Sequence, residues 1–386
     1  MDNENWGSSD NEQSALKPGL LDRRGFLFSS MVVAAGATLG RWVPSAEAAQ
    51  IGGQLEIISW EGYSTQKESA KWLAANGVKL NASVMSTQDD VTAKLVGNPV
   101  RLDVAEYAFG YNEVYQQIKA LTPIDTSKIP NYGKANILEN FYQGPTWFWD
   151  GQNWGIPWCW GLNALVYNPK VIPEIKTYKD LLKPELKGKL AFVDDTTATW
   201  PMIARLAGYG AKYPHLTQAE MKDSFEKIIP YREQSRVFAA SNGDVVSLFV
   251  AGEIAACFCV WSAVPVQTAL QGVETAYVVP EEGGVVWADA WFIPMTSVNR
   301  DTALAFINEA LDPQVQADMA RNTTSGVVNR KAVELLDPAT RALFNYDNLA
   351  TIFDRSLLQG PPPQTSTQYA TYGDWMQAWS DFKSGF

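Results

Sequence analysis

LEIISWEGYSTQKESAKWLAANG, residues 55–77, is the stretch that decides the fold. Its first six residues form an apolar run typical of a buried strand. The part from Ser64 to Gly77 has the start signal, spacing and end signal of a helix. A second apolar run, VKLNASVM at 78–85, follows at once and predicts another strand. A strand, a helix and a strand in this order favour an α/β fold with a largely parallel sheet.

The same alternation continues along the chain. Further strands are expected at 102–109, 161–168, 189–193, 254–261 and 275–280. Helices are expected at 87–98, 112–121, 178–185, 197–210, 243–253, 263–272 and 300–311. Near the C-terminus, aromatic residues recur at helical spacing and predict one packed stripe of a last helix: Tyr372, Trp375, Trp379 and Phe382.

Composition limits the class of protein. The chain has 386 residues, 46% of them hydrophobic and 19% charged, which is typical of a globular protein of about two domains. The formal net charge of −11 repels phosphate backbones and argues against nucleic acid as a partner. An acidic surface is compatible with a cationic ligand, although solubility explains the charge equally well. We expect no membrane span after processing, because no mature stretch offers eighteen uninterrupted apolar residues.

Residues 1–48 have the pattern of a secretory signal that is later removed. A polar leader ends in Arg23-Arg24-Gly25-Phe26-Leu27, and the short apolar run FSSMVVAAGATLG at 28–40 follows it. Ala46-Glu47-Ala48 forms a cleavage site of the A-x-A type. The paired arginines resemble a twin-arginine export signal, which predicts a mature protein in a bacterial periplasm.

Motifs for catalysis or metal binding are scarce. A triad hydrolase needs a base beside its nucleophile, but His215, the single histidine, lies in a predicted surface loop before a capping box of Thr217 and Glu220. There is no nucleotide-binding or zinc-protease motif, and we expect no metal and no cofactor. The three cysteines read as small core residues: Cys159, Cys257 and Cys259. A glycosidase with a carboxylate pair remains an alternative, since acids abound near aromatics.

Aromatic and acidic side chains gather at four predicted strand ends. These are SWEGY (59–63), VDDTT (193–197), VWS (260–262) and VVWADAW (285–291). Open α/β sheets bind ligands at the carboxyl ends of their strands. A cation gains about 0.5–2 kcal/mol from each good aromatic contact, and a carboxylate fixes it by a charge-assisted hydrogen bond. Taken alone, Asp195 fits a helix cap equally well and each tryptophan fits a core. The repetition at several strand ends favours a site.

The stretch WFWDGQNWGIPWCW, residues 147–160, holds five tryptophans. It fits either a crowded core or one wall of an aromatic site. We expect its tryptophans mainly to pack, with Trp158 or Trp160 as the candidates to reach a ligand.

The sequence resembles the solute-binding proteins of bacterial ABC importers, specifically the polyamine-binding (spermidine/putrescine) group. The resemblance covers residues 54–385, and the matching blocks occur in the same order and spacing. They are ISWEGY, LTPIDTSKIPNY, GIPWCWGLNALVYN, LLKPELKGKLAFVDD, FVAGEIAACFCVWS, PEEGGVVWADAWFIP and AFINEALDPQVQADMA.

The resemblance implies a type II periplasmic-binding-protein fold of two α/β lobes. Each lobe is expected to hold a mostly parallel sheet flanked by helices, and the ligand is trapped as the lobes close. The first lobe is expected at 51–158 with 289–328, and the second at 159–288 with 329–386. Hinge crossings are expected near Pro157–Gly161 and Trp287–Asp289.

The resemblance also implies ligand-binding residues. Trp60 and Tyr63 match aromatics of the first block, Asp195 an acid of the second lobe, Trp261 an aromatic wall, and Trp287 with Asp289 a Trp-x-Asp pair whose carboxylate binds an amine. This chain departs from the family in two acids. Gly62 stands where the first-block acid is expected, with Glu61 one position earlier, and Ala198 stands three residues after Asp195. A ligand smaller or less charged than spermidine is therefore expected.

The prediction for function is a periplasmic binding protein, not an enzyme. It would capture a small organic cation, such as putrescine or a smaller monocation, and deliver it to an ABC permease and its ATPase. A monomer is expected. The alternatives are a binding protein for a sugar or other neutral solute, since tryptophan faces also hold pyranose rings, and the glycoside hydrolase with a carboxylate pair.

Overall fold

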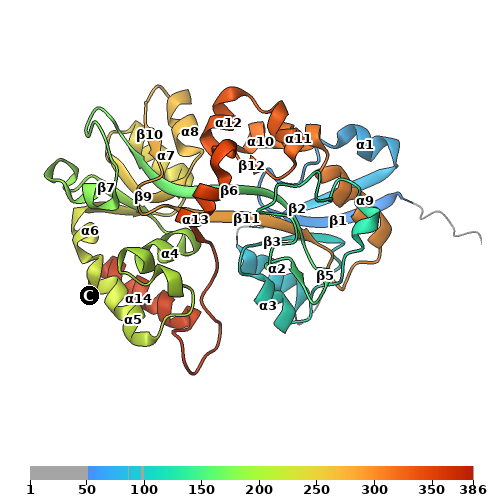
Figure 1. Ribbon diagram of the computed structural model, residues 1–386, viewed down its shortest axis with the longest axis horizontal. Helices are drawn as coiled ribbons and strands as arrows, with labels where there is room; N and C mark the ends of the chain where they lie inside the picture. Colours follow the sequence, from blue (N-terminus) through green and yellow to red (C-terminus); the bar gives the residue numbers. More distant parts are fainter. Residues whose placement is uncertain (1–50, 86, 97–99, 386) are drawn as a thin grey trace, which may run out of the picture. The chain divides into compact units, whose positions relative to one another are not determined.

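The computed structural model describes residues 51–85, 87–96 and 100–385. The predicted export signal at 1–48 therefore lies outside the described residues. A central sheet of eleven strands organises this part of the chain (Figure 1). Its main path runs through β2 (Val78–Val84), β1 (Gly53–Ser59), β3 (Val104–Ala108), β11 (Val285–Phe292), β6 (Ile156–Tyr167), β9 (Ala256–Trp261), β7 (Leu190–Val193) and β8 (Ser235–Ala239).

The sheet is parallel at both ends and antiparallel in the middle. Strand β1 runs parallel to β2 and β3, and β7 runs parallel to β8 and β9. The long strands β6 and β11 lie side by side as an antiparallel pair across the centre (Figure 1). Short strands complete the β-structure: β10 (Ala276–Val278) and β12 (Gly326–Val327) pair with β6, β13 (Leu357–Leu358) pairs with β11, and β4 (Phe148–Trp149) pairs with β5 (Gln152–Asn153).

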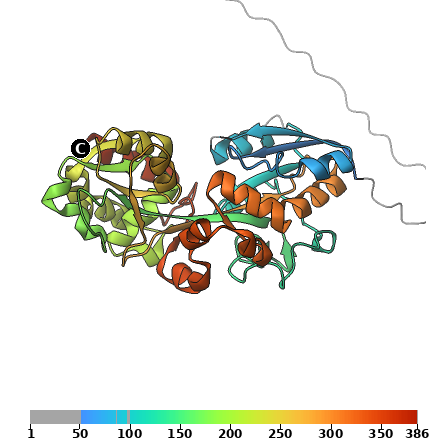
Figure 2. The same cartoon turned by 90° about the horizontal axis from the view of Figure 1, so that it is seen from above.

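Helices pack beside both ends of the sheet, in two groups separated by the crossing strands (Figure 2). The first group is α1 (Ala70–Ala75), α2 (Gln88–Leu95), α3 (Asn112–Gln117), α9 (Arg300–Ala310), α10 (Pro313–Thr323) and α11 (Arg330–Leu335). Helices α12 (Pro338–Phe344) and α13 (Leu349–Arg355) lie beside the middle of the sheet, near β6 and β11 (Figure 1). The second group is α4 (Thr196–Leu206), α5 (Gln218–Lys227), α6 (Ile229–Gln234), α7 (Asn242–Val250), α8 (Val264–Leu270) and α14 (Tyr372–Ser384). Short 3₁₀ turns occur at Thr126–Lys128, Tyr178–Leu182, Pro184–Leu186, Gly210–Lys212 and Tyr346–Asn348.

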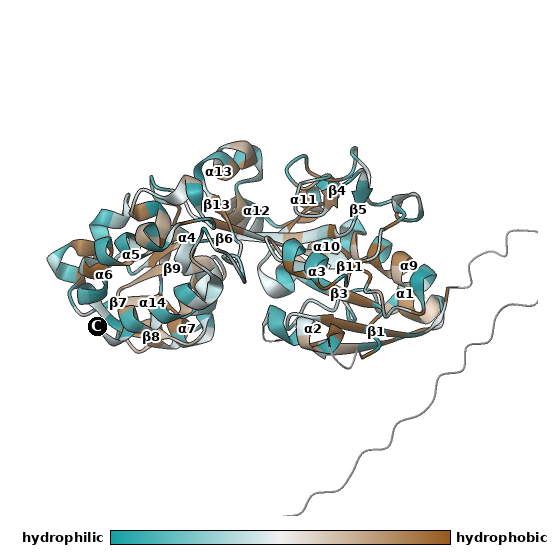
Figure 3. Cartoon of the chain, turned by 90° about the horizontal axis from the view of Figure 1, so that it is seen from below, coloured by the Kyte–Doolittle hydropathy of each residue, from teal (hydrophilic) through white to brown (hydrophobic). Residues whose placement is uncertain are grey.

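The two-lobed α/β fold is confirmed, but the sheet is mixed where a largely parallel one was expected, because β6 pairs antiparallel with β9 and β11. The helices of each group cover apolar cores of their own, and Figure 3 shows brown, hydrophobic stretches among teal ones in the strands near β1. The lobe boundaries remain a prediction. Within residues 329–386, Phe344 and Leu349 belong to the first core, whereas Trp375, Trp379 and Phe382 belong to the second.

One helix prediction was wrong at its start. The helix expected from Ser64 begins only at Ala70, and turns precede it. Thr65 has a φ of 50°, a left-handed conformation that interrupts a right-handed helix. By contrast, the capping box of Thr217 and Glu220 is confirmed at the start of α5.

The packing role of the tryptophan-rich stretch 147–160 is confirmed. Trp147, Trp158 and Trp160 are at most 1% exposed and belong to the first core. Trp149 and Trp154 stack on each other with ring centroids 5.4 Å apart. The three cysteines are buried and free, as expected. Among the residues with a described position, no helix is long and apolar enough to cross a membrane.

Candidate ligand-binding site

Three of the predicted site residues lie on one face of the sheet. Trp261 of β9 pairs with Asn163 of β6, and Asn163 pairs with Val285 of β11. Paired residues point to the same face, and every second residue along a strand shares that face. Trp287 and Asp289, two and four residues after Val285, therefore point to the same face as Trp261.

The same face continues into β3 at one side. Asp289 pairs with Ala108 of β3, so Glu106, two residues earlier, also points to this face. A second buried acid thus lies on the strand next to Asp289.

At the other side, β7 lies next to β9 in the same sheet. A bulge in β9 between Cys257 and Val260 interrupts the register on this side. Asp195 lies two residues beyond the end of β7, at the start of α4.

Trp287 and Asp289 lie in the middle of β11 and not at a strand end, which corrects the expectation from sequence. Strand β11 passes beyond the site because it crosses the centre of the sheet. Trp287 lies over Gly161 of β6, where a Cβ atom would come within 2.2 Å of the indole. Only a glycine at 161 leaves room for this ring.

Asp289 is 4% exposed and has two polar neighbours. The Trp60 side chain donates a hydrogen bond to its carboxylate, and Cys159 Sγ lies 3.8 Å from Oδ2. Burial raises the pKa of Asp289 to about 7, and these two hydrogen bonds only partly oppose the rise. Burial therefore favours the protonated form of this group more than in an exposed carboxyl group.

Glu106 is a site residue that the sequence analysis missed. It is fully buried, and its Oε2 accepts a hydrogen bond of 3.0 Å from the Trp60 amide. Burial and the neighbouring Asp289 raise its pKa well above the ordinary range. The Trp60 amide and the Trp158 indole lower the pKa by a smaller amount. Within the described part of the chain, neither Oε1 of Glu106 nor Nε1 of Trp158 makes a hydrogen bond of ordinary geometry. A glutamate inside the apolar strand VAEYA was the available signal.

The turn after β1 brings aromatic residues to the acids. The Tyr63 amide donates to the Trp60 carbonyl at 3.0 Å, and Gly62 has a φ of 81°, as type II turns require. The Tyr63 ring stands edge-on to Trp158, with centroids 5.4 Å apart. Burial raises the Tyr63 pKa, as do the charges of Cys159, Asp289 and Glu106. Glu61 occupies the turn and is exposed.

Asp195 and Trp261 form a second group. The Oδ1 atom of Asp195 caps α4, accepting from the amides of Thr197 and Ala198 at 3.0 and 3.3 Å. The interactions found for Asp195 connect it to α4, Cys259 and three tyrosines, not to Asp289. The Trp261 indole N–H lacks a hydrogen-bond partner among the described residues. Ala198 is buried in the second core.

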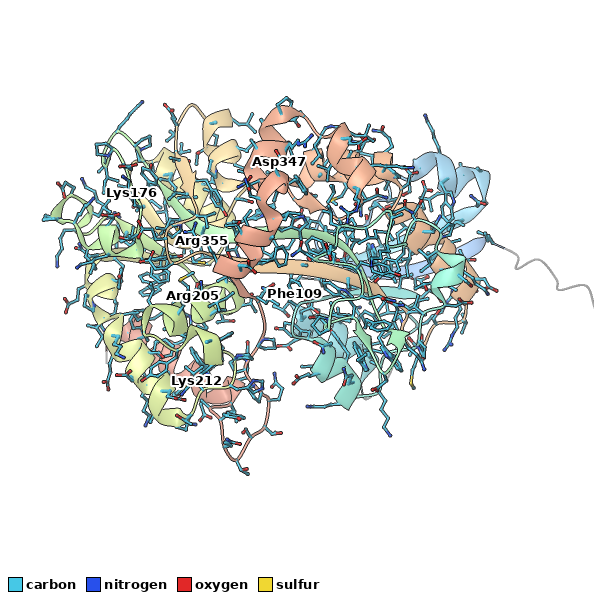
Figure 4. The ribbon with its side chains drawn as sticks, viewed as in Figure 1. Phe109, Lys176, Arg205, Lys212, Asp347 and Arg355 are labelled. Carbon is cyan, nitrogen blue, oxygen red and sulfur yellow. The ribbon has the colours of Figure 1, made fainter. Side chains whose placement is uncertain are left out.

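No basic side chain in the described residues pairs with Asp289 or Glu106. The ion pairs found there use other carboxylates. Arg205 and Arg355, labelled near the centre of Figure 4, donate instead to backbone carbonyls such as those of Glu282 and Pro280. Nor do three or more histidine, cysteine or acidic residues of this part of the chain group as metal ligands. The acids are thus buried without a countercharge.

Comparison with known proteins defines the class. The model of the bacterial extracellular solute-binding protein family matches residues 69–351, and the chain belongs to this family. It is a distant homologue of the spermidine/putrescine-binding periplasmic proteins of ABC transporters. As expected from the sequence, the family is not enzymatic, which sets the glycosidase alternative aside.

Three relatives show how far the similarity extends. The Escherichia coli spermidine/putrescine-binding periplasmic protein is 26% identical over 316 residues, covering 81% of this chain and 87% of the relative. The putrescine-binding periplasmic protein of the same organism is 23% identical, covering 74% and 81%. The solved spermidine/putrescine ABC transporter substrate-binding protein of Streptococcus pneumoniae has a TM-score of 0.72 at 20% identity, covering 86% and 98%.

Proposed function

We propose that this solute-binding protein captures a small organic cation, either a polyamine-like amine such as putrescine or a smaller monocation. Trp60, Tyr63, Trp261 and Trp287 would supply aromatic walls, and Asp289 would hold the ammonium group. Asp195 is proposed as a second, more distant acid. The ligand-binding role of Glu61 remains a prediction. Its side chain is exposed in the turn next to Trp60.

The observation that carries this proposal is Asp289, a buried carboxylate without a cationic partner in the described residues. A buried unpaired charge is costly, whereas a bound ammonium would compensate it. A hydrogen bond to a charged group contributes about 1.5–3 kcal/mol. The nearby indole and phenol faces suit a cation, and a neutral sugar would leave the carboxylate charge uncompensated.

The proposal extends to transport. Membership in this family implies that the protein binds its solute outside the cytoplasm and delivers it to the permease of an ABC transporter. We propose that the permease works with its ATPase at the inner membrane, and that Arg23 and Arg24 direct the precursor to the twin-arginine route.

A thermal-shift screen of amines, betaines, sugars and amino acids tests the ligand class. A ligand at 100 times its Kd stabilises the folded protein by about 2.7 kcal/mol. We expect stabilisation by putrescine or another small amine and none by sugars. Stabilisation by sugars alone would contradict the proposal.

A further inference from the structure

Two buried carboxyl groups, Glu106 and Asp289, share one face of the sheet on adjacent strands. They interact electrostatically, and like charges in a buried site resist simultaneous ionisation. The titratable groups that face them are Tyr63 from the turn after β1 and Cys159 from β6. Both are acids as well, so none of these neighbours can neutralise the pair.

A second observation points from this pair to a ligand. Oε1 of Glu106 makes no hydrogen bond of ordinary geometry in the described residues, although the Trp158 indole, whose nitrogen also lacks one, lies close enough to lower the Glu106 pKa. Most buried polar atoms have a partner, and an exception needs an explanation. An acceptor oxygen beside Asp289 has the chemistry that an ammonium group with several N–H donors requires.

We propose that Glu106 is a second acidic residue of the amine site, and that it shares with Asp289 a proton that leaves when the ammonium group binds. This inference rests on the proposed function. The ligand keeps all its own protons, and the proton released from the carboxyl pair goes to solvent. The proposed pair of acids favours primary amines over quaternary ammonium compounds, because the latter have no N–H group to donate.

The direction of the pH dependence follows from the raised pKa values of both acids. Because each carboxyl group keeps its proton up to a higher pH than an ordinary carboxyl group does, protons compete with the cation near pH 7. Amine affinity should therefore fall as the pH falls from 8 to 6. The slope of log affinity against pH equals the number of protons released.

Calorimetric titration with putrescine in buffers of different ionisation enthalpy measures this release. For the unaltered protein we expect release of about half a proton to one proton per ligand at pH 7. Glu106→Gln retains the shape of the side chain but cannot ionise, so release and pH slope should both decrease. Its affinity should be roughly three- to tenfold lower at pH 8 and closer to that of the unaltered protein at pH 6. Equal slopes for the two proteins, or no release at all, would overturn the inference.

Glu309→Gln is the matched control. Glu309 is a partly buried glutamate of α9 whose pKa is also raised by burial, and it is outside the site. Its substitution should leave the affinity and the pH slope unchanged.

Infrared spectra without ligand separate this inference from the proposed function. Between pH 6 and pH 8 the unaltered protein should lose the carbonyl band of a protonated carboxylic acid, and Glu106→Gln should lose less of it. Absence of that change would overturn the shared proton even if putrescine binds. A normal infrared change, with no amine bound at any pH, would contradict the proposed function instead.

Discussion

Asp289 is the residue on which amine affinity should depend most, because it combines burial, contact with Trp60 and the absence of a basic partner in the described residues. Asp289→Asn retains the shape of the side chain and removes its charge. We expect the affinity for putrescine to fall at least about tenfold, from loss of a charged hydrogen bond, while the protein stays folded. Titration calorimetry and a thermal melt measure the two effects.

Asp103→Asn provides a control for burial. Asp103 is fully buried too, but it pairs with Arg101 at 2.7 Å and accepts from backbone amides. Asp103→Asn should lower the free energy of unfolding but leave the affinity for putrescine unchanged. An Asp289→Asn variant that binds putrescine like the unaltered protein would show that the ammonium group is held elsewhere.

At the level of single residues, the sequence predicted part of the candidate site. Trp60, Tyr63, Trp287 and Asp289 could be selected by resemblance, and the structure brings them together around β11. Glu106 was not selected, because a glutamate in the apolar run VAEYA was its one local signal. Its importance comes from the register of β3 against β11, which joins residues almost two hundred positions apart. Asp195 could not be assigned one role from the sequence. Its Oδ1 atom caps α4, and its second carboxylate oxygen is compatible with a ligand-binding role.

Among the elements, the antiparallel pair β6 and β11 positions the site, and Gly161 is its tightest point. A Cβ atom there would overlap the Trp287 indole. Gly161→Ala should displace that ring, reduce amine affinity several-fold and cost about 1–3 kcal/mol of stability through overpacking. Calorimetry and denaturant unfolding provide the measurements.

Gly243→Ala in α7 is the control, since its Cβ would lie 3.6 Å from Ser241 Oγ, an ordinary contact. We expect unchanged affinity and a change in stability within about 1 kcal/mol. If Gly161→Ala also bound like the unaltered protein, Trp287 would not be a wall of the site.

Sequence periodicity predicted most elements but not how they join. Strands β1, β2 and β9 were expected near their observed positions, because apolar runs bounded by turn residues identify strands. The order that inserts β11 between β3 and β6 could not be read from local patterns, since it depends on pairing of distant segments. The late start of α1 depended on the left-handed conformation of Thr65, which threonine adopts rarely.

For the molecule as a whole, ligand length follows from where the acids lie. Besides the Glu106–Asp289 pair on the sheet, the other acid proposed for the site is Asp195, in the separate group at the start of α4. Gly62 and Ala198 stand where further acids were expected, and Ala198 packs in the core. An extra ammonium group would therefore be buried without a partner, which costs several kcal/mol.

We expect putrescine or a short monoamine to bind more tightly than spermidine. Competition calorimetry over a series of amines of increasing length measures this order. A series in which spermidine binds most tightly would mean that Asp195 or Glu61 reaches the bound ligand.

The most direct test of the central claim is a crystal structure of the protein with putrescine. The account predicts an ammonium nitrogen within about 3 Å of the Asp289 carboxylate, a charge-assisted hydrogen-bond distance, next to the rings of Trp60 and Trp287. A putrescine molecule bound away from β11, with no contact between its nitrogens and Asp289, would contradict it.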